Sequence, residues 1–295
     1  MAKSLLFALP GNEAMAAALS EAAGADLGAL DIHRFPDEET HLRFETDLRG
    51  RRAIFVCTLD RPDAKYLPLV LAAATARELG AERVGLVAPY LCYMRQDKRF
   101  TEGEAVSARL FASEISRHFD WLVTVDPHLH RLNALSAIYK IPARAVHAAP
   151  LISEWIEREI ETPVVIGPDA ESAQWAASVA EDAHAPFAIL EKTRRGDREV
   201  RVHLPDAARF AGHTAVLVDD IISTGRTMAE TVSHLRAAGL DAPVCIGVHG
   251  VFAPGALEGL KKAGAGTIVT TNTIAHPTNA IDVTGLIAQS MRTMP

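Results

Sequence analysis

The sequence is short of cysteine, of positive charge and of long apolar runs. Its three cysteines, Cys57, Cys92 and Cys245, lie far apart in or beside apolar runs, which is typical of buried thiols in a reducing compartment rather than of disulfides or a metal site. A formal net charge of -7 argues against nucleic-acid binding, which usually needs a basic face. No apolar run approaches the roughly 20 residues that span a bilayer, and the first residues lack the basic flank and apolar segment of a secretory signal. We therefore expect a cytoplasmic protein that binds neither a membrane nor nucleic acid.

The composition is that of an ordinary globular protein, with 48% hydrophobic and 23% charged residues. A length of 295 residues exceeds a typical single core and suits two domains. The basic residues gather in a few short segments, so an otherwise acidic protein offers local positive charge to small phosphorylated anions. These clustered residues are Arg95, Lys98, Arg99, Arg131, Lys192, Arg194, Arg195 and Arg198.

Apolar runs of strand length alternate with longer Ala-rich segments of helical period. Such alternation is typical of parallel sheets covered by helices on both faces. The sequence therefore predicts an α/β fold with two tandem doubly wound parallel-sheet domains that meet near residues 148–150. The expected strands are residues 4–9, 52–59, 83–90, 121–126, 162–169, 187–192, 214–220, 244–252 and 266–272. The expected helices are residues 14–23, 66–79, 107–118, 170–182, 227–238 and 254–263.

Several expected strands end in chemically useful residues. Asp126, Asp169, Lys192 and the pair Asp219 and Asp220 all stand at such ends. Open α/β sheets bind ligands beyond the carboxyl ends of their strands. The sequence therefore predicts ligand sites at these positions.

The string VLVDDIISTGRT, residues 216–227, joins two like charges to a turn of small residues before a helix. Adjacent carboxylates at a buried strand end repel each other and lose hydration, so a ligand should offset that cost. The turn exposes backbone N–H groups and the hydroxyls of Ser223, Thr224 and Thr227 at the positive end of a helix dipole, which suits a phosphate. The carboxylates can accept hydrogen bonds from a neighbouring diol, so the string indicates a sugar phosphate. A strand-end Asp that caps a helix after an ordinary turn is the alternative.

This string resembles the PRPP-binding motif (PRPP is 5-phosphoribosyl 1-diphosphate) that type I phosphoribosyltransferases share with ribose-phosphate pyrophosphokinases. Other segments resemble the pyrophosphokinases in that family's order. RFPDEE at residues 34–39 is similar to Arg-Phe-x-Asp-x-Glu, and residues 88–112 contain an Arg-Gln-Asp-Lys core. VDPHLH, GPD, LEKTRR and DVTGLIAQSM, at residues 125–130, 167–169, 190–195 and 282–291, match further family segments. By this combination the sequence is identified as a member of the ribose-phosphate pyrophosphokinase family.

The resemblance implies an enzyme that moves the β,γ-diphosphate of ATP to the anomeric hydroxyl of ribose 5-phosphate, giving PRPP and AMP. It implies phosphoribosyltransferase-type domains at residues 1–148, on the ATP side with the oligomer contacts, and at residues 149–280, with the ribose 5-phosphate site. Residues 281–295 are expected to pack back on the first domain. The predicted ribose 5-phosphate residues are Asp219, Asp220, Ser223, Thr224, Gly225 and Thr227.

For the nucleotide, the resemblance implies that Arg95 and Gln96 donate to phosphate and base and that Phe35 stacks on adenine. In this family the residues of the RFPDEE segment come from a neighbouring subunit, which implies a homo-oligomer of dimers, commonly a hexamer. Without the other motifs, RFPDEE would be a surface turn before a strand. The predicted ATP residues are Phe35, Asp37, Glu39, Arg95, Gln96 and Asp97.

Lys192 and Arg194 are the predicted catalytic residues, since phosphoryl transfer depends on neutralising the charge that develops on phosphate oxygens. The hydrophilic residues 193–201 could form a mobile flap or a solvated charged hairpin. The predicted cofactor is Mg²⁺, with His128 and Asp169 as metal residues and Asp126 as a further candidate. His128 and His130 also suggest zinc, but no third His or Cys ligand stands at a recognisable spacing.

The sequence departs from the family pattern at Ser223, where many pyrophosphokinases have Asp, at Pro127 in place of Leu, and at residues 170–172 in place of a glycine-rich turn. VHGVFAPGAL at residues 248–257 follows the family pattern only loosely. Because this region and the loops near residues 47–50 bear on allosteric regulation, regulation does not carry over from the resemblance. Two other functions fit parts of the chain. A type I phosphoribosyltransferase explains residues 215–228 but gives the first domain no task, and a catalytically silent regulatory relative should lack the cations and carboxylates that this chain retains.

Overall fold

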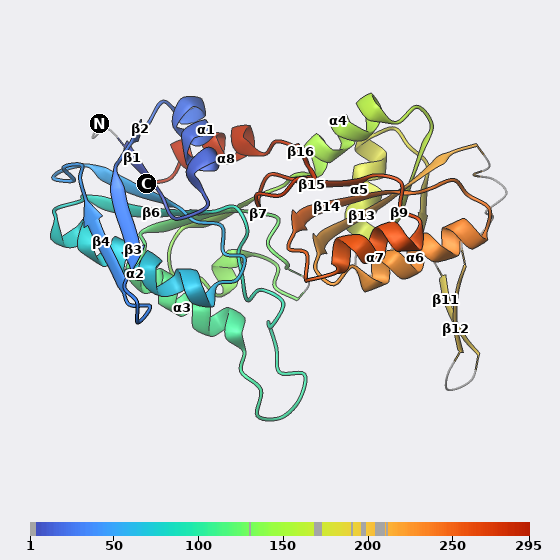
Figure 1. The fold of residues 1–295 in the computed structure, drawn as a ribbon, viewed down its shortest axis with the longest axis horizontal. Helices are drawn as coiled ribbons and strands as arrows, with labels where there is room; N and C mark the ends of the chain where they lie inside the picture. Colours follow the sequence, from blue (N-terminus) through green and yellow to red (C-terminus); the bar gives the residue numbers. More distant parts are fainter. Residues whose placement is uncertain are drawn as a thin grey trace. The chain divides into compact units, whose positions relative to one another are not determined.

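The computed structural model describes residues 4–129, 131–167, 173–189, 191–195, 199–203, 210 and 212–295. The chain divides into two compact units, shown in Figure 1. Unit 1 comprises Met1–His147, Thr273–Ala275 and Val283–Pro295, and unit 2 comprises Ala148–Asn272 and His276–Asp282. Within the described ranges, no helix combines the length and the apolar composition that crossing a bilayer requires.

Unit 1 is built on a six-stranded sheet in the order β2-β1-β5-β6-β7-β8, and every neighbouring pair is parallel. The apolar runs of β5, β6 and β7 are almost entirely buried, as expected for central strands covered on both faces. The strands are β1 (Ser4–Ala8), β2 (Asp26–Leu27), β5 (Arg52–Val56), β6 (Arg83–Ala88), β7 (Trp121–Val125) and β8 (Ala143–Val146).

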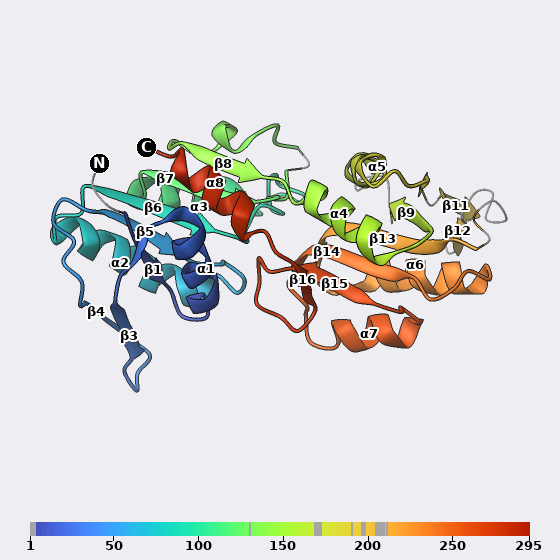
Figure 2. The ribbon, with the colours of Figure 1, turned by 90° about the horizontal axis from the view of Figure 1, so that it is seen from above.

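Four α-helices cover this sheet, and the last of them comes from the end of the chain. Helix α8 packs on α1 and contacts β7 and β8 (Figure 2). Arg52 Nη2 donates to the Met294 carbonyl at 2.9 Å, which ties the chain end to β5. The helices are α1 (Glu13–Ala23), α2 (Asp63–Glu78), α3 (Ser107–His118) and α8 (Thr284–Arg292), with a 3₁₀ turn at Leu135–Ala137.

A hairpin of β3 (Leu30–Arg34) and β4 (Thr40–Phe44) extends from unit 1 (Figure 2). Its two strands are antiparallel, with Leu30 opposite Phe44 and Ile32 opposite Leu42. The Phe44 ring packs edge-on against Phe7 with centroids 5.0 Å apart. The apolar side chains therefore share one face of the hairpin and anchor it to the core.

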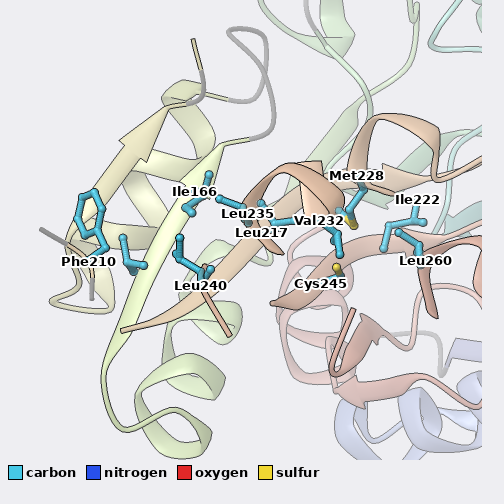
Figure 3. Close-up of a cluster of buried hydrophobic side chains, with 12 residues drawn as sticks. Ile166, Phe210, Leu217, Ile222, Met228, Val232, Leu235, Leu240, Cys245 and Leu260 are labelled. Carbon is cyan, nitrogen blue, oxygen red and sulfur yellow. The ribbon is translucent and has the colours of Figure 1, made fainter. Parts of the chain in front are cut away.

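Unit 2 is also built on a parallel six-stranded sheet, in the order β10-β9-β13-β14-β15-β16. The strands are β9 (Pro163–Gly167), β10 (Phe187–Ile189), β13 (Thr214–Ile222), β14 (Val244–Gly250), β15 (Ile268–Thr271) and β16 (Asn279–Ile281). The helices are α4 (Ala149–Glu159), α5 (Ala173–Asp182), α6 (Arg226–Ala237) and α7 (Ala256–Ala263). Leu217 of β13 and Val232 and Leu235 of α6 are fully or almost fully buried in one core cluster (Figure 3).

The predicted fold class, an α/β protein with two doubly wound parallel sheets, is confirmed. One expected strand is divided in two. Residues 187–192 form two elements, because β10 ends at Ile189 and a separate antiparallel hairpin of β11 (Glu191–Arg195) and β12 (Glu199–His203) begins at Glu191. Figure 1 shows this hairpin extending from the sheet of unit 2.

Candidate functional site

Strand β13 carries both aspartates of the motif. It continues to Ile222 and is thus two residues longer than the apolar pattern predicts. Both side chains are half-buried, and Asp219 Oδ1 accepts a hydrogen bond from the Asp220 N–H at 3.0 Å. Because successive residues of a strand point to opposite faces, the two carboxylates diverge, which weakens their repulsion.

The turn between β13 and α6 has the features of an anion site. Gly225 adopts a left-handed conformation, φ 67°, directly before the helix, which glycine does at little cost. The Ser223 carbonyl accepts from the Ala253 N–H at 3.0 Å, which ties the turn to the loop after β14. Thr224 and Thr227 are exposed. Their hydroxyls stand beside first-turn N–H groups that have no partner within the helix, at the positive end of its dipole.

The segment after β6 carries the Arg-Gln-Asp core. Arg95 and Gln96 are exposed. The Asp97 side chain, in contrast, is only 3% exposed, and its Oδ1 accepts from Arg131 Nη1 at 3.0 Å. The Arg131 guanidinium also lies 5.3 Å from the centroid of the Phe100 ring. Asp97 therefore holds a further cation at this segment, whereas Arg95 and Gln96 face solvent.

The loop after β7 begins with Asp126, which is 8% exposed and has a φ of 30°. Its Oδ1 lies 2.8 Å from Nδ1 of the mostly exposed His147, which follows β8. This hydrogen bond raises the pKa of His147, because the carboxylate favours the charged imidazolium. His128 is half-buried two residues further on, while His130 lies outside the described residues. Sequence reasoning missed His147, since only the pairing of β7 with β8 brings it to Asp126.

The RFPDEE segment forms the turn of the β3–β4 hairpin. The Phe35 N–H donates to the Glu39 carbonyl at 2.9 Å, and the Glu39 N–H donates to Asp37 Oδ1 at 3.2 Å. Arg34 Nη2 donates to the Ala64 carbonyl at 2.7 Å, which ties the turn to the first residues of α2. The Phe35 ring is 46% exposed. The turn therefore presents an aromatic face and the carboxylates of Asp37, Glu38 and Glu39 at the surface.

The predicted catalytic pair lies in β11. Lys192 is paired with Val202 and Arg194 with Val200 across the antiparallel β11–β12 ladder. Both predicted residues therefore stand in one strand of an antiparallel two-stranded ladder. Asp169, the predicted metal residue of unit 2, lies outside the described residues.

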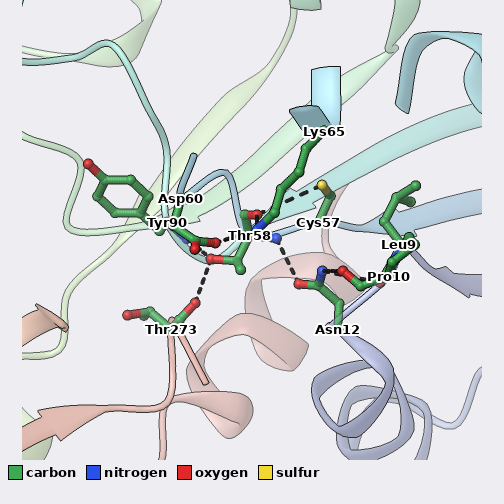
Figure 4. A network of polar contacts seen from close by, with 9 residues as sticks. All are labelled: Leu9, Pro10, Asn12, Cys57, Thr58, Asp60, Lys65, Tyr90 and Thr273. Carbon is green, nitrogen blue, oxygen red and sulfur yellow. Dashed lines mark hydrogen bonds and ion pairs between the residues drawn. The ribbon is translucent and has the colours of Figure 1, made fainter. Parts of the chain in front are cut away.

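A buried polar network surrounds Thr58, just after β5 (Figure 4). The Thr58 hydroxyl donates to the Thr273 carbonyl at 2.6 Å and accepts from the Tyr90 N–H at 3.3 Å. The Thr58 N–H donates to Asn12 Oδ1 at 2.7 Å, and Lys65 Nζ donates to the Thr58 carbonyl at 2.9 Å. Four separate segments of unit 1 therefore meet at one residue, next to the start of the Arg-Gln-Asp segment. Sequence reasoning did not single out any of these residues as part of a polar network.

The described candidates fall into two groups, one in each unit. Unit 1 holds the hairpin turn, the Arg-Gln-Asp segment and the Asp126 loop, and the last two follow the adjacent parallel strands β6 and β7. Unit 2 holds the β13–α6 turn and the β11–β12 hairpin. Two of these groups suit phosphate chemistry at the carboxyl ends of parallel strands. The β13–α6 turn offers backbone and hydroxyl donors, and the segments after β6 and β7 offer Arg95, Arg131 and Asp126.

Two family models match the chain. The N-terminal domain of ribose phosphate pyrophosphokinase matches residues 4–118, and the phosphoribosyl transferase domain matches residues 134–285.

Curated relatives and solved structures agree with these matches. A ribose-phosphate pyrophosphokinase of Saccharolobus solfataricus is 34% identical over 259 residues, covering 87% of this chain and 88% of the relative. One from Methanopyrus kandleri is 33% identical over 278 residues, covering 94% of each. The crystal structure of phosphoribosylpyrophosphate synthetase from Mycobacterium smegmatis superimposes with a TM-score of 0.86 at 27% identity and covers 98% of both chains.

Proposed function

The chain belongs to the ribose-phosphate pyrophosphokinase family, whose members make PRPP from ATP and ribose 5-phosphate, and we propose how its own residues serve that reaction. The anomeric oxygen of ribose 5-phosphate forms a bond to the β-phosphorus of ATP. The bond from that phosphorus to the oxygen bridging to the α-phosphate breaks, and AMP leaves.

The β13–α6 turn is the single observation that carries the assignment of ribose 5-phosphate to unit 2. We assign the 5-phosphate to Thr224, Gly225 and Thr227, where N–H groups, exposed hydroxyls and the helix dipole favour an anion. Ser223 adds a further hydroxyl. Asp219 and Asp220 accept hydrogen bonds from the ribose hydroxyls.

We assign ATP to unit 1. Arg95 and Gln96 are exposed and donate to the phosphates and the base, while Asp97 acts through Arg131, the cation that it holds. The exposed ring of Phe35 stacks on adenine, and Asp37 and Glu39 accept from its amino group or the ribose. These three residues serve the site of a neighbouring copy, so the active protein is a homo-oligomer built from dimers.

We propose Lys192 and Arg194 as the catalytic cations that stabilise the charge on the transferred diphosphate. The donor set of unit 1 fits Mg²⁺, because the Asp126 carboxylate and the His128 imidazole stand at one strand end beside the proposed phosphate site, and Mg²⁺ commonly takes one or two protein ligands plus phosphate and water. Asp169 is proposed as the metal residue of unit 2. When bound, Mg²⁺ neutralises phosphate charge.

The test incubates the purified protein with ATP, ribose 5-phosphate and Mg²⁺ and follows AMP and PRPP together. We expect both products in equal amounts, with no AMP when ribose 5-phosphate is omitted. Absence of substrate-dependent AMP with several nucleotides and divalent metals contradicts the assignment. A protein that instead consumes PRPP with a nucleobase is a phosphoribosyltransferase.

A further inference from the structure

The β3–β4 hairpin gathers three metal-ligating side chains on the face opposite its apolar anchor. His33 stands directly across from His41, and Asp31 lies two residues before His33 on the same face. One ligand atom from each side chain lies within 4.8 Å of the others, the one such group of three among the described residues. Arg43 is on this face too, and its guanidinium is paired with Glu45 at 2.6 Å.

The two imidazole rings stack on each other, with centroids 4.4 Å apart. Asp31 Oδ2 lies 3.6 Å from His33 Nδ1. His41 Nδ1 is buried and has no hydrogen-bond partner within the described part of the chain, although buried polar atoms normally have a protein, water or ion partner.

We propose that Asp31, His33 and His41 form a binding site for a divalent transition-metal ion of the Zn²⁺ class. Two imidazole nitrogens and one carboxylate oxygen are ligands that Zn²⁺ and Co²⁺ favour, and three protein ligands leave a position for water. Mg²⁺ prefers oxygen ligands, so a site that offers two imidazoles suits it poorly. The hairpin site also differs in position from the proposed nucleotide metal at Asp126 and His128, where phosphate and water supply most of the ligands.

The site lies beside the turn that carries Phe35. The Phe35 ring contacts His33 edge-on at 5.4 Å and His41 at 5.9 Å between centroids. An ion that binds both imidazoles holds in place the two rings that contact Phe35. It also links the strands on either side of the turn. If the proposed function holds, metal binding orders the adenine-stacking residue before ATP arrives and tightens ATP binding without changing the chemical step.

The experiment titrates the tag-free, full-length protein with Co²⁺ in the absence of nucleotide and follows the visible absorption of the bound ion. We expect one site per chain with the spectrum of nitrogen and oxygen ligands. Zn²⁺ should displace the Co²⁺, and a large excess of Mg²⁺ should not.

Variants locate the bound ion. His33→Ala and the isosteric Asp31→Asn should each weaken Co²⁺ binding by about tenfold or more. Two controls should keep the wild-type affinity. His184→Asn removes a different exposed imidazole, which pairs with Glu157 at 2.9 Å, and His128→Asn removes the imidazole of the proposed nucleotide metal. Unchanged binding in Asp31→Asn and His33→Ala, or loss in His128→Asn, overturns the proposal.

Kinetics test the link to the nucleotide separately. Protein loaded with Zn²⁺ and then freed of excess metal should have a lower KM for ATP than metal-free protein, at equal kcat, and His33→Ala should show no difference. Equal KM values in loaded and metal-free wild type overturn the link to ATP. A protein that binds Co²⁺ as predicted but makes no PRPP refutes the proposed function and leaves the metal site standing.

Discussion

Replacing Thr58 by Val tests whether the buried network of unit 1 depends on one hydroxyl. Thr58 is 6% exposed, and its hydroxyl makes two hydrogen bonds, to the Thr273 carbonyl at 2.6 Å and from the Tyr90 N–H at 3.3 Å. Valine has nearly the same shape but neither donates nor accepts. Thr58→Val therefore removes both bonds while it leaves the packing of the site in place.

The cost follows from the two backbone groups that lose this partner. A buried polar group deprived of a hydrogen bond costs about 1–3 kcal/mol, and the longer bond from Tyr90 contributes toward the low end. We expect the free energy of unfolding to fall by about 2–4 kcal/mol. For a domain of about 150–250 residues each kcal/mol lowers Tm by about 2–4 °C, so the transition of unit 1 should fall by about 4–16 °C in calorimetry.

Thr58→Ser is the matched control, because it keeps the hydroxyl and removes one methyl group. The methyl contributes roughly 1 kcal/mol, so Thr58→Ser should be the more stable of the two variants. The Tyr90 bond also fixes the start of the segment that carries Arg95, so Thr58→Val should raise KM for ATP more than KM for ribose 5-phosphate. A Thr58→Val protein at least as stable as Thr58→Ser refutes the reasoning.

Further predictions concern the proposed site, the packing and the thiols. Lys192→Ala should lower kcat by orders of magnitude with ATP affinity by calorimetry nearly unchanged, because its charge acts mainly in the transition state; near-normal turnover contradicts this role. Asp220→Asn should raise KM for ribose 5-phosphate more than KM for ATP, and equal losses indicate misfolding instead. Gly85→Ala would place a Cβ 2.1 Å from the indole of Trp121, so denaturant titration should show a loss of at least about 1–3 kcal/mol. Its control, Gly259→Ala on the open face of α7, should gain about 0.5–1 kcal/mol. The native thiols should react very slowly with a disulfide reagent at pH 8 and all three should react after denaturation, whereas rapid labelling of the native protein contradicts their burial. Burial raises the pKa of the Cys57 and Cys245 thiols to about 12, and it also raises the pKa of the Cys92 thiol.

The sequence predicted the two sheets because their central strands are apolar throughout. A run such as residues 83–88 can only be a strand covered on both faces or part of a buried helix, and the flanking turns decide for the strand. The burial of the three cysteines followed from the same runs. The hairpin β3–β4 escaped prediction although Leu30, Ile32, Leu42 and Phe44 have the two-residue period of a half-buried hairpin, because five-residue strands with charged partners give a weak signal.

Helices α4 and α8 were missed for a different reason. The buried residues of α4 include Ile152, Trp155 and Ile156, which have helical spacing, but the helix begins at the expected domain boundary and has no side-chain cap. Residues 284–292 suggested a family-specific segment, and the resemblance implied that residues 281–295 pack back on the first domain, but no helix was predicted there. Helix α8 packs on α1, at the other end of the chain.

The candidate site shows the same difference: residues within a local motif could be predicted, and residues that act through distant contacts could not. The β13–α6 turn could be predicted because all of its polar residues lie within twelve consecutive positions. His147 and Thr58 could not, because each acts through a contact that is distant in sequence: His147 with Asp126, 21 positions away, and Thr58 with Thr273, 215 positions away.

The two adjacent aspartates show that the fold can also change what a local motif implies about a binding site. As sequence, Asp219 and Asp220 are two like charges forced together at a strand end. In the fold the strand continues through both, so its alternation turns the carboxylates to opposite faces, and Asp219 already accepts the N–H of Asp220. The two carboxylates therefore repel each other less than their spacing in the sequence indicates, and a ligand has less repulsion to offset. Its electrostatic cost alone would not identify a sugar-phosphate site, and the stronger argument for the proposed ribose 5-phosphate site is the turn that follows, with a left-handed Gly225 and exposed hydroxyls beside the first turn of α6.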